Sequence, residues 1–424
     1  MQTLFSSPHL NATSSSLRQT TISGNADESY VLSLAALNEK YAAMSSGSTS
    51  TSANKSDTCP IHIYSKNTLQ RMQTFPGHEV ASTSMRSISV IAGLNGPILM
   101  SSGKDGSVRV WDERSGSHGI KMTNLGKSQP LLAFDVSPDG YSVAAGTELQ
   151  GDDALVLFWD PRQPAAPLRS HSCTHSDDIT VVQFAPGRPG MLLTASSDGL
   201  ISLSNAEEPD EDEAVVTVGN WGCSISQAGW MQDGSQIWAA SDMETFSTWS
   251  EELDLLQSHD IRAPCLHSGP RTWVTDYLIT ASSSNVTEPG RLGVFVGSNE
   301  GDIALLSNSD LSTSRGTGDW YIHNLWTAGH QGVVRSVLWD EQEQVLVTGG
   351  EDGLINVWPG LSPPMDYSGL GGRGVVHESD SMDVDSEPAE ISSRKRFREM
   401  DVEWEGDDNG LTSKESKNGK RSKR

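Results

Sequence analysis

The chain has 424 residues, of which 35% are apolar and 20% are charged, and it contains 12 Trp and 40 Gly. This composition supplies apolar side chains for a packed core and many Gly for turns, which excludes a chain that is disordered throughout. The 55 acidic residues outnumber the 30 basic ones and give a net charge of −25. Because a surface of this sign repels phosphate backbones, we do not expect the main body to bind DNA or RNA.

The cysteines and the apolar segments bear on the cellular compartment. The four cysteines form no C-x-x-C pair, so neither a disulfide framework nor a zinc ribbon is predicted, and a reducing compartment fits. The first 20 residues lack a basic stretch that leads into an apolar core, and no segment has the run of about 20 apolar residues that a bilayer requires. We therefore expect a soluble protein that is not secreted and does not insert into a membrane.

In chain order, residues 1–16 are predicted to be disordered, and the β-prone segment Arg18–Ser23 has no obvious partner of its own. The clearest unit after that is Ile98–Asp112: an apolar strand, an Asp-Gly turn and an alternating strand that ends in Trp-Asp. A second copy runs from Val345 to Trp358. A Gly-His pair precedes each copy, which indicates an internal repeat.

These residues resemble the WD-repeat family, whose blades carry Gly-His near the start and Trp-Asp near the end. Fainter copies give seven units in all. The resemblance implies an all-β, seven-bladed β-propeller over residues 17–359, with four antiparallel strands in each blade, because only stacking in a closed ring buries both apolar faces of a blade. The last unit ends at Pro359 without an obvious fourth strand, so Arg18–Ser23 is predicted to pair there and close the ring. The units end at Tyr64-Ser65, Trp111-Asp112, Trp159-Asp160, Ser204-Asn205, Trp249-Ser250, Leu306-Ser307 and Trp358-Pro359.

Residues 360–424 change to Pro- and Gly-rich and then charged sequence, which predicts a disordered tail. Ten basic and 13 acidic residues lie beyond residue 377, so the rest of the chain has a net charge of −22. Two basic clusters resemble nuclear-import signals and predict a nuclear protein that is also present in the cytoplasm; the alternative is a solubilising tail, or one with weak nucleic-acid contacts. The clusters consist of Arg394, Lys395, Arg396 and Arg398, and of Lys420, Arg421, Lys423 and Arg424.

The family resemblance also implies a buried relay in each blade that is superficially like a catalytic triad. A buried imidazole and carboxylate are destabilising unless they satisfy each other, so the relay is predicted to fix blade geometry. The fourth unit keeps only His175, Thr194 and Asp198. No nucleophile–base pair or metal set is found elsewhere, so we expect no enzymatic activity and no cofactor. The two complete sets are His78, Ser101, Asp105 and Trp111, and His330, Thr348, Asp352 and Trp358.

Two other motifs resemble ligand-binding sequences. His171, Cys173 and His175 alternate along a strand, so their side chains could share one face and bind a metal; the structural alternative is a buried His175 and a surface His171. The G-x-G-x-x-G at Gly369–Gly374 follows a Pro-rich linker and opens no helix, so no nucleotide site is predicted.

Seven residues are candidates for partner binding. Arg114 and Arg162 end consecutive W-D-x-R motifs, and resemblance to substrate receptors of cullin-type ubiquitin ligases implies that they dock the linker subunit; the alternative is solvated Arg. Arg86 and Arg335 are expected at the same position of neighbouring sectors, where they would form a cationic patch. Lys104, Glu351 and Trp221 complete the set on the rim loops.

Over residues 30–359 and the basic tail, the chain most resembles the WD repeat-containing protein 89 family. We predict a non-enzymatic scaffold that binds proteins, in a nuclear complex, with a monomeric propeller. The alternatives are a substrate receptor of a cullin-type ubiquitin ligase and a nuclear assembly or ribosome-biogenesis factor.

Overall fold

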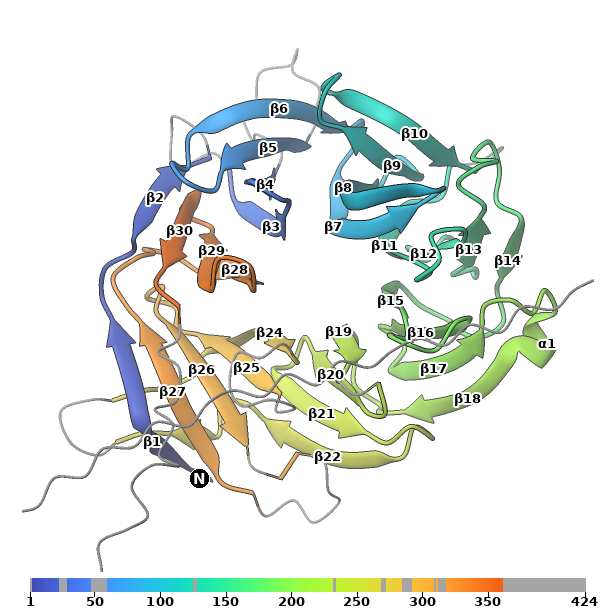
Figure 1. Cartoon of the computed structure of the whole chain (residues 1–424). Helices are drawn as coiled ribbons and strands as arrows, with labels where there is room; N and C mark the ends of the chain where they lie inside the picture. Colours follow the sequence, from blue (N-terminus) through green and yellow to red (C-terminus); the bar gives the residue numbers. More distant parts are fainter. Residues whose placement is uncertain are drawn as a thin grey trace, which may run out of the picture. The chain divides into compact units, whose positions relative to one another are not determined.

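A computed structural model describes residues 2–22, 29–46, 59–124, 128–231, 234–267, 272–283, 292–308, 310–311 and 318–360. The predicted C-terminal tail, with its two basic clusters, lies outside these residues. The described part consists of 30 strands and one short helix, α1 (Glu211–Ala214), and the sheets follow one another around a ring (Figure 1).

The first three sheets in the chain are four-stranded and antiparallel. The first sheet contains β3 (Val31–Ala36), β4 (Lys40–Ser45), β5 (Cys59–Ser65) and β6 (Arg71–His78). The second contains β7 (Ser82–Ile91), β8 (Leu94–Gly103), β9 (Ser107–Asp112) and β10 (Ser117–Thr123). The third contains β11 (Leu131–Val136), β12 (Val143–Thr147), β13 (Val156–Trp159) and β14 (Arg169–His171).

Three further four-stranded sheets have the same plan. The fourth sheet contains β15 (Ile179–Phe184), β16 (Met191–Ser196), β17 (Leu200–Asn205) and β18 (Val215–Asn220). The fifth contains β19 (Ile225–Trp230), β20 (Ile237–Ser241), β21 (Thr245–Trp249) and β22 (Leu255–Asp260). The last sheet contains β28 (Val334–Asp340), β29 (Val345–Gly350), β30 (Leu354–Trp358) and, from the N-terminus, β2 (Arg18–Thr21).

The remaining sheet differs from a four-stranded blade. It has six strands in the order β23-β1-β27-β26-β25-β24. The structure therefore has six four-stranded blades, and the prediction of seven such blades is wrong. The extra strands are β1 (Gln2–Thr13) and β23 (Pro264–Cys265), which extend the set β24 (Tyr277–Ser282), β25 (Gly293–Gly297), β26 (Ile303–Asn308) and β27 (Trp320–Trp326).

The N-terminal strand β1 explains this difference. Residues 1–16 were predicted to be disordered, but β1 pairs in parallel with β27. Leu4 is only 1% exposed and belongs to the core cluster that contains Trp273 and Trp320. The pairing shifts register between Ser6 and Asn11. A strand so irregular, with one deeply buried apolar side chain, shows no periodic pattern that sequence reasoning detects.

The ring is closed at the N-terminal segment. Strand β2 pairs antiparallel with β30 from Arg18↔Val357 to Thr21↔Leu354, which is the pairing expected for the segment that starts at Arg18. Strand β28 of this last blade packs against β3 of the first blade. In Figure 1 the first strand of each four-stranded blade, counted along the chain from β3, lies nearest the centre, and the fourth strand lies outermost. In the last blade, β2 is the outermost strand.

Packing between neighbouring blades forms the core. Between the second and third sheets, Met100 and Val110 lie in one cluster with Phe134 and Trp159. Each side chain of this kind contributes about 1.5–3 kcal/mol when it leaves water. Because each blade meets a neighbour on both faces, its strands are buried on both sides, as in β9, where five consecutive residues are buried. All seven expected terminal pairs lie at the end of a third strand or directly beside it.

Candidate functional site

The second blade contains a complete hydrogen-bonded relay. His78 ends β6, Ser101 lies in β8, Asp105 in the β8–β9 turn and Trp111 in β9. The His78 Nδ1 atom lies 2.9 Å from Asp105 Oδ1, and Nε2 lies 2.7 Å from Ser101 Oγ. Trp111 Nε1 donates to the same Ser101 Oγ at 2.8 Å. The structure thus brings all four predicted residues together.

The last blade repeats this arrangement. His330 Nδ1 lies 3.1 Å from Asp352 Oδ1, and Nε2 lies 2.8 Å from Thr348 Oγ1. Trp358 Nε1 donates to Thr348 Oγ1 at 2.9 Å. Gly350 is required beside this imidazole, because a Cβ at that position would lie 2.8 Å from His330 Nδ1.

Burial and charge indicate what these relays do. The His78 side chain is 0% exposed, and both of its ring nitrogens contact relay partners. Burial alone would raise the pKa of Asp105, but hydrogen bonding to His78 lowers it below its usual range. The carboxylate therefore stays charged while it holds both the imidazole and the Glu79 backbone N–H, 3.2 Å away. A solute cannot reach the ring, so the arrangement fixes the turn.

The relay has a fifth position that its sequence motif did not predict. Arg109 pairs with Ser101 across β8 and β9, and Asn356 pairs with Thr348 across β29 and β30. Arg109 Nη1 donates to Gly77 O at 3.0 Å, and Asn356 Nδ2 donates to Gly329 O at 2.9 Å. Each side chain thus holds the carbonyl directly before the relay His. The available signal was a buried strand position that carries Arg or Asn between apolar neighbours.

The fourth blade has a looser relay. His175 Nε2 lies 2.8 Å from Thr194 Oγ1, but Nδ1 is 3.5 Å from Asp198 Oδ2. Ser202 occupies the fifth position, and its hydroxyl is buried without a hydrogen-bond partner among the described residues. Burial would raise the pKa of Asp198, but its bonds with His175 and backbone N–H groups lower it to about 2. The missing Trp and the small Ser leave this His less tightly held.

The two ends of the ring carry different loops. Because successive strands of a blade are antiparallel, the turn between its second and third strands lies opposite the turns that flank them. We call the end with Asp105 and Asp352 the relay rim. The opposite end, with the first-to-second and third-to-fourth turns, is the hairpin rim.

Three of the candidate partner-binding residues lie on the relay rim. Lys104 forms an ion pair with Glu148 of the third blade at 3.1 Å. Glu351 forms an ion pair with Arg335. Trp221 meets Trp249 edge-on and donates its Nε1–H to Ser258 Oγ at 3.2 Å. These side chains have local partners, and Trp221 is partly exposed beside them.

The expected cationic patch of Arg86 and Arg335 is not formed. Arg86 lies opposite Met100 in the second blade, whereas Arg335 precedes Ser336, which lies opposite Gly349 in the last blade. The first blade separates the two, so they are neither at the same position nor on neighbouring sectors. Arg335 pairs with Glu351, and Arg86 approaches a carboxylate of the third blade.

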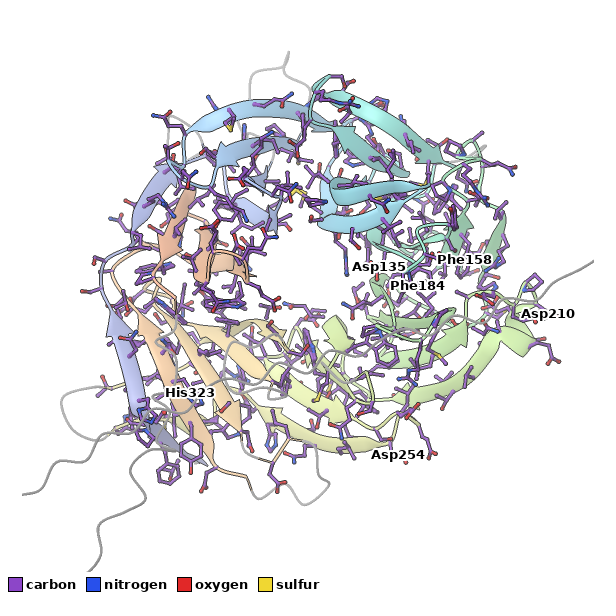
Figure 2. The ribbon with its side chains drawn as sticks, in the orientation of Figure 1. Asp135, Phe158, Phe184, Asp210, Asp254 and His323 are labelled. Atoms are coloured by element: carbon purple, nitrogen blue, oxygen red, sulfur yellow. The ribbon has the colours of Figure 1, made fainter. Side chains whose placement is uncertain are left out.

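That carboxylate is Asp135, on the inner side of the ring beside Phe184 (Figure 2). The Arg86 Nη1 atom lies 3.6 Å from Asp135 Oδ1, and Asp135 Oδ2 accepts the Phe184 N–H at 2.8 Å. Burial raises the pKa of Asp135 despite the Arg86 charge. Through these two contacts Asp135 links the second, third and fourth blades.

The W-D-x-R arginines lie on the hairpin rim of adjacent blades. The Arg114 side chain is 93% exposed and contacts Asp112 at 3.3 Å. The Arg162 side chain is 59% exposed, makes a close pair with Asp160 at 2.7 Å and lies over the Tyr141 ring, 4.7 Å from its centroid. Both guanidinium groups are therefore held near their own blade, and Arg114 is the more accessible.

The sequence-predicted metal alternative has no matching geometry. His171 is buried against Phe158, with ring centroids 4.9 Å apart, whereas Cys173 is exposed. Within the described ranges, no three His, Cys, Asp or Glu side chains are placed to hold a metal ion. All four cysteines are unpaired. No helix in the part of the chain that the structure describes is long and apolar enough to cross a membrane.

Two complete relays inside propeller blades define a WD-repeat protein, and sequence comparison gives the same class. The family described as "WD domain, G-beta repeat" matches residues 69–112 and 322–359, the two stretches that contain these relays. The chain is a WD-repeat protein, with several homologues among WD repeat-containing proteins.

Three of these relatives span most of the propeller. The WD repeat-containing protein 89 homolog of Dictyostelium discoideum is 25% identical over 70% of this chain and 77% of its own length. An uncharacterized WD repeat-containing protein of Saccharomyces cerevisiae is 29% identical over 72% of this chain and 75% of its own. WD repeat-containing protein GTS1 of Arabidopsis thaliana is 31% identical over 62% of this chain and 66% of its own.

Proposed function

We propose that this protein is a non-enzymatic scaffold that binds protein partners through the rims of its propeller. The observation that carries this proposal is the burial of the relays. The His78 imidazole is fully buried, with both nitrogens engaged, so the constellation most like a catalytic triad serves blade geometry. Partner contacts then fall to the exposed loops, where a rigid ring holds side chains in fixed positions.

Proximity labelling of the full chain, followed by mass spectrometry, tests the scaffold function. We expect a reproducible set of proteins to be enriched over the labelling enzyme alone. Such a set also separates a nuclear assembly role from a ribosome-biogenesis role by the proteins that it contains. If no protein is enriched, the scaffold proposal is wrong.

We further propose that the protein acts in the nucleus. The support is the pair of basic clusters near the C-terminus, which are cationic enough to fit the acidic grooves of an import carrier. Removing residues 390–424 from a fluorescent fusion should shift the fluorescence toward the cytoplasm. Persistent nuclear accumulation of the truncated fusion would refute this assignment.

A second candidate function is substrate receptor of a cullin-type ubiquitin ligase. Arg114 and Arg162 support it, because both are exposed on the same rim of adjacent blades. Pull-down with the linker subunit should succeed with the wild-type chain and fail after both are changed to Ala.

Arg262 provides a control for the ligase test, because it pairs with Asp260 two residues earlier in the same Asp-x-Arg geometry. Changing Arg262 together with the exposed Arg335 to Ala removes the same charge from the relay rim. Equal loss of binding in both double variants would show that the W-D-x-R arginines do not dock the linker subunit specifically.

A further inference from the structure

A cavity lies on the hairpin rim where the first, second and last blades meet. Its volume is about 480 Å³. Residues 36–38 of the β3–β4 turn form one wall, residues 339–342 at the end of β28 form the second, and Ser87, Ser89, Gly96 and Pro97 of the β7–β8 hairpin form the third. Three blades thus contribute to one concave site beside the junction at which the ring closes.

The charge around this cavity is negative. Glu341 lines it, and Glu39 and Glu343 lie in the same two turns. All three are exposed, and none forms an ion pair with another described residue. The neighbouring cations are already used, because Lys40 pairs with Glu113 and Lys66 pairs with Asp340. The cavity mouth therefore carries uncompensated negative charge.

The walls supply the other features of a site for a cationic side chain. Trp339 offers an aromatic ring, and ring faces of Trp attract ammonium and guanidinium groups most strongly. Ala36 and Pro97 give an apolar surface for the methylene stem of a long side chain. Ser87 and Asn38 add polar atoms that can accept from N–H donors.

We propose that this cavity receives an arginine or lysine side chain from a basic segment of a partner protein. The inference rests on the proposed scaffold function and names the chemistry of one partner. The net charge of −25 favours the same class of partner, since a field of this sign steers cationic segments toward the protein. The cavity then selects the side chain that enters.

A labelled peptide of alternating Arg and Gly, with five Arg, is the probe for fluorescence anisotropy with the full chain. We expect salt-dependent binding, and no binding of the matching peptide with Glu in place of Arg. The triple variant Glu39→Gln, Glu341→Gln and Glu343→Gln should weaken binding about tenfold, because three exposed carboxylates are neutralised. Trp339→Phe should weaken it about twofold to threefold.

The matched control removes three exposed carboxylates elsewhere, by Glu207→Gln, Glu213→Gln and Glu300→Gln. It should bind within about twofold of wild type, and melting curves of both triple variants should match, since all six residues are exposed. Equal weakening in both triple variants, or none in the cavity variant, would overturn the site. Failure of the wild-type chain to bind the probe would also overturn it, whereas the scaffold function is judged separately by proximity labelling.

Discussion

The ion pair between Lys66 and Asp340 joins the first and last blades, and its removal tests how the ring is held closed. Lys66 follows β5, and Asp340 ends β28, so the pair links residues at opposite ends of the propeller sequence. The Lys66 Nζ atom lies 2.7 Å from Asp340 Oδ2, and both side chains are 2% exposed. Tyr41 Oη donates to the same oxygen at 2.9 Å. The perturbation is Asp340→Asn.

This substitution keeps an oxygen for Tyr41 but removes the counter-charge of Lys66. A buried ammonium without a partner destabilises the folded state, and breaking such a pair costs about 3–5 kcal/mol. The exposed pair of Arg188 and Glu251 provides the control, because its side chains are partly exposed to water. Glu251→Gln should therefore change the free energy of unfolding by no more than about 1 kcal/mol.

Urea unfolding of the wild type and the variants measures these differences. The double variant Lys66→Met with Asp340→Asn should be more stable than Asp340→Asn alone, because no charge is left buried. If Asp340→Asn destabilises the protein no more than Glu251→Gln does, the buried pair does not hold the junction and the reasoning fails.

The pH dependence of the same variant follows from the carboxyl group. Burial alone would raise the pKa of Asp340, but bonds from Lys66 and Tyr41 lower it below its usual value. Its contribution is therefore complete above the unfolded-state pKa of about 3.9 and is lost as the pH falls through the lower folded-state pKa. The stability difference between wild type and Asp340→Asn should be constant near neutrality and shrink in acid.

Three further predictions concern the relay, the N-terminus and an acidic loop. Asp352→Ala should cost about 1–3 kcal/mol in urea unfolding, because the His330 Nδ1 atom loses its carboxylate partner; an unchanged midpoint would contradict the structural role. Deleting residues 1–24 should lower the melting temperature by many degrees, because β1 and β2 are lost; an unchanged melting curve would refute closure by this segment. Glu211→Gln should cost about 1 kcal/mol at pH 7, because the Glu211 carboxylate accepts three backbone N–H bonds from residues 172–174; equal stability would show that these bonds contribute nothing.

The parts of the fold that sequence predicted well are those encoded by local pattern. Asp-Gly turns between an apolar strand and an alternating strand recur with Gly-His before them, and the family resemblance that these motifs support placed His78 and Asp105 in one relay. The pairing of the segment at Arg18 with β30 followed from counting strands in the last unit. The relay thus depends on residues at specific positions of the motif, whereas the closing strand was predicted from a strand missing in the last unit.

The errors on the N-terminal strand and on the two arginines have different causes. Strand β1 has no period of two, and its place in the six-stranded sheet depends on burial of Leu4 among residues more than 220 positions away. Strands β7 and β28 have the same register relative to their Gly-His pairs, but Arg86 is eight residues after His78 and Arg335 is five residues after His330. The Arg-Ser sequence that both sites share therefore placed the two arginines at one level, although counting from each His separates them.

The junction between the first and last blades explains why the buried ion pair and the negatively charged cavity lie close together. A propeller must join its first and last blades without a covalent link, and here strand β2 supplies the backbone pairing while Lys66 and Asp340 supply a buried charge pair. Apolar packing alone does not define which blades meet, because apolar faces are interchangeable. A buried carboxylate is stable only where a neighbouring blade supplies a matching cation, so the charge pair specifies the junction. Asp340 ends β28 between Trp339 and Glu341, and all three residues line the cavity, so the junction at which the ring closes also carries this negatively charged cavity.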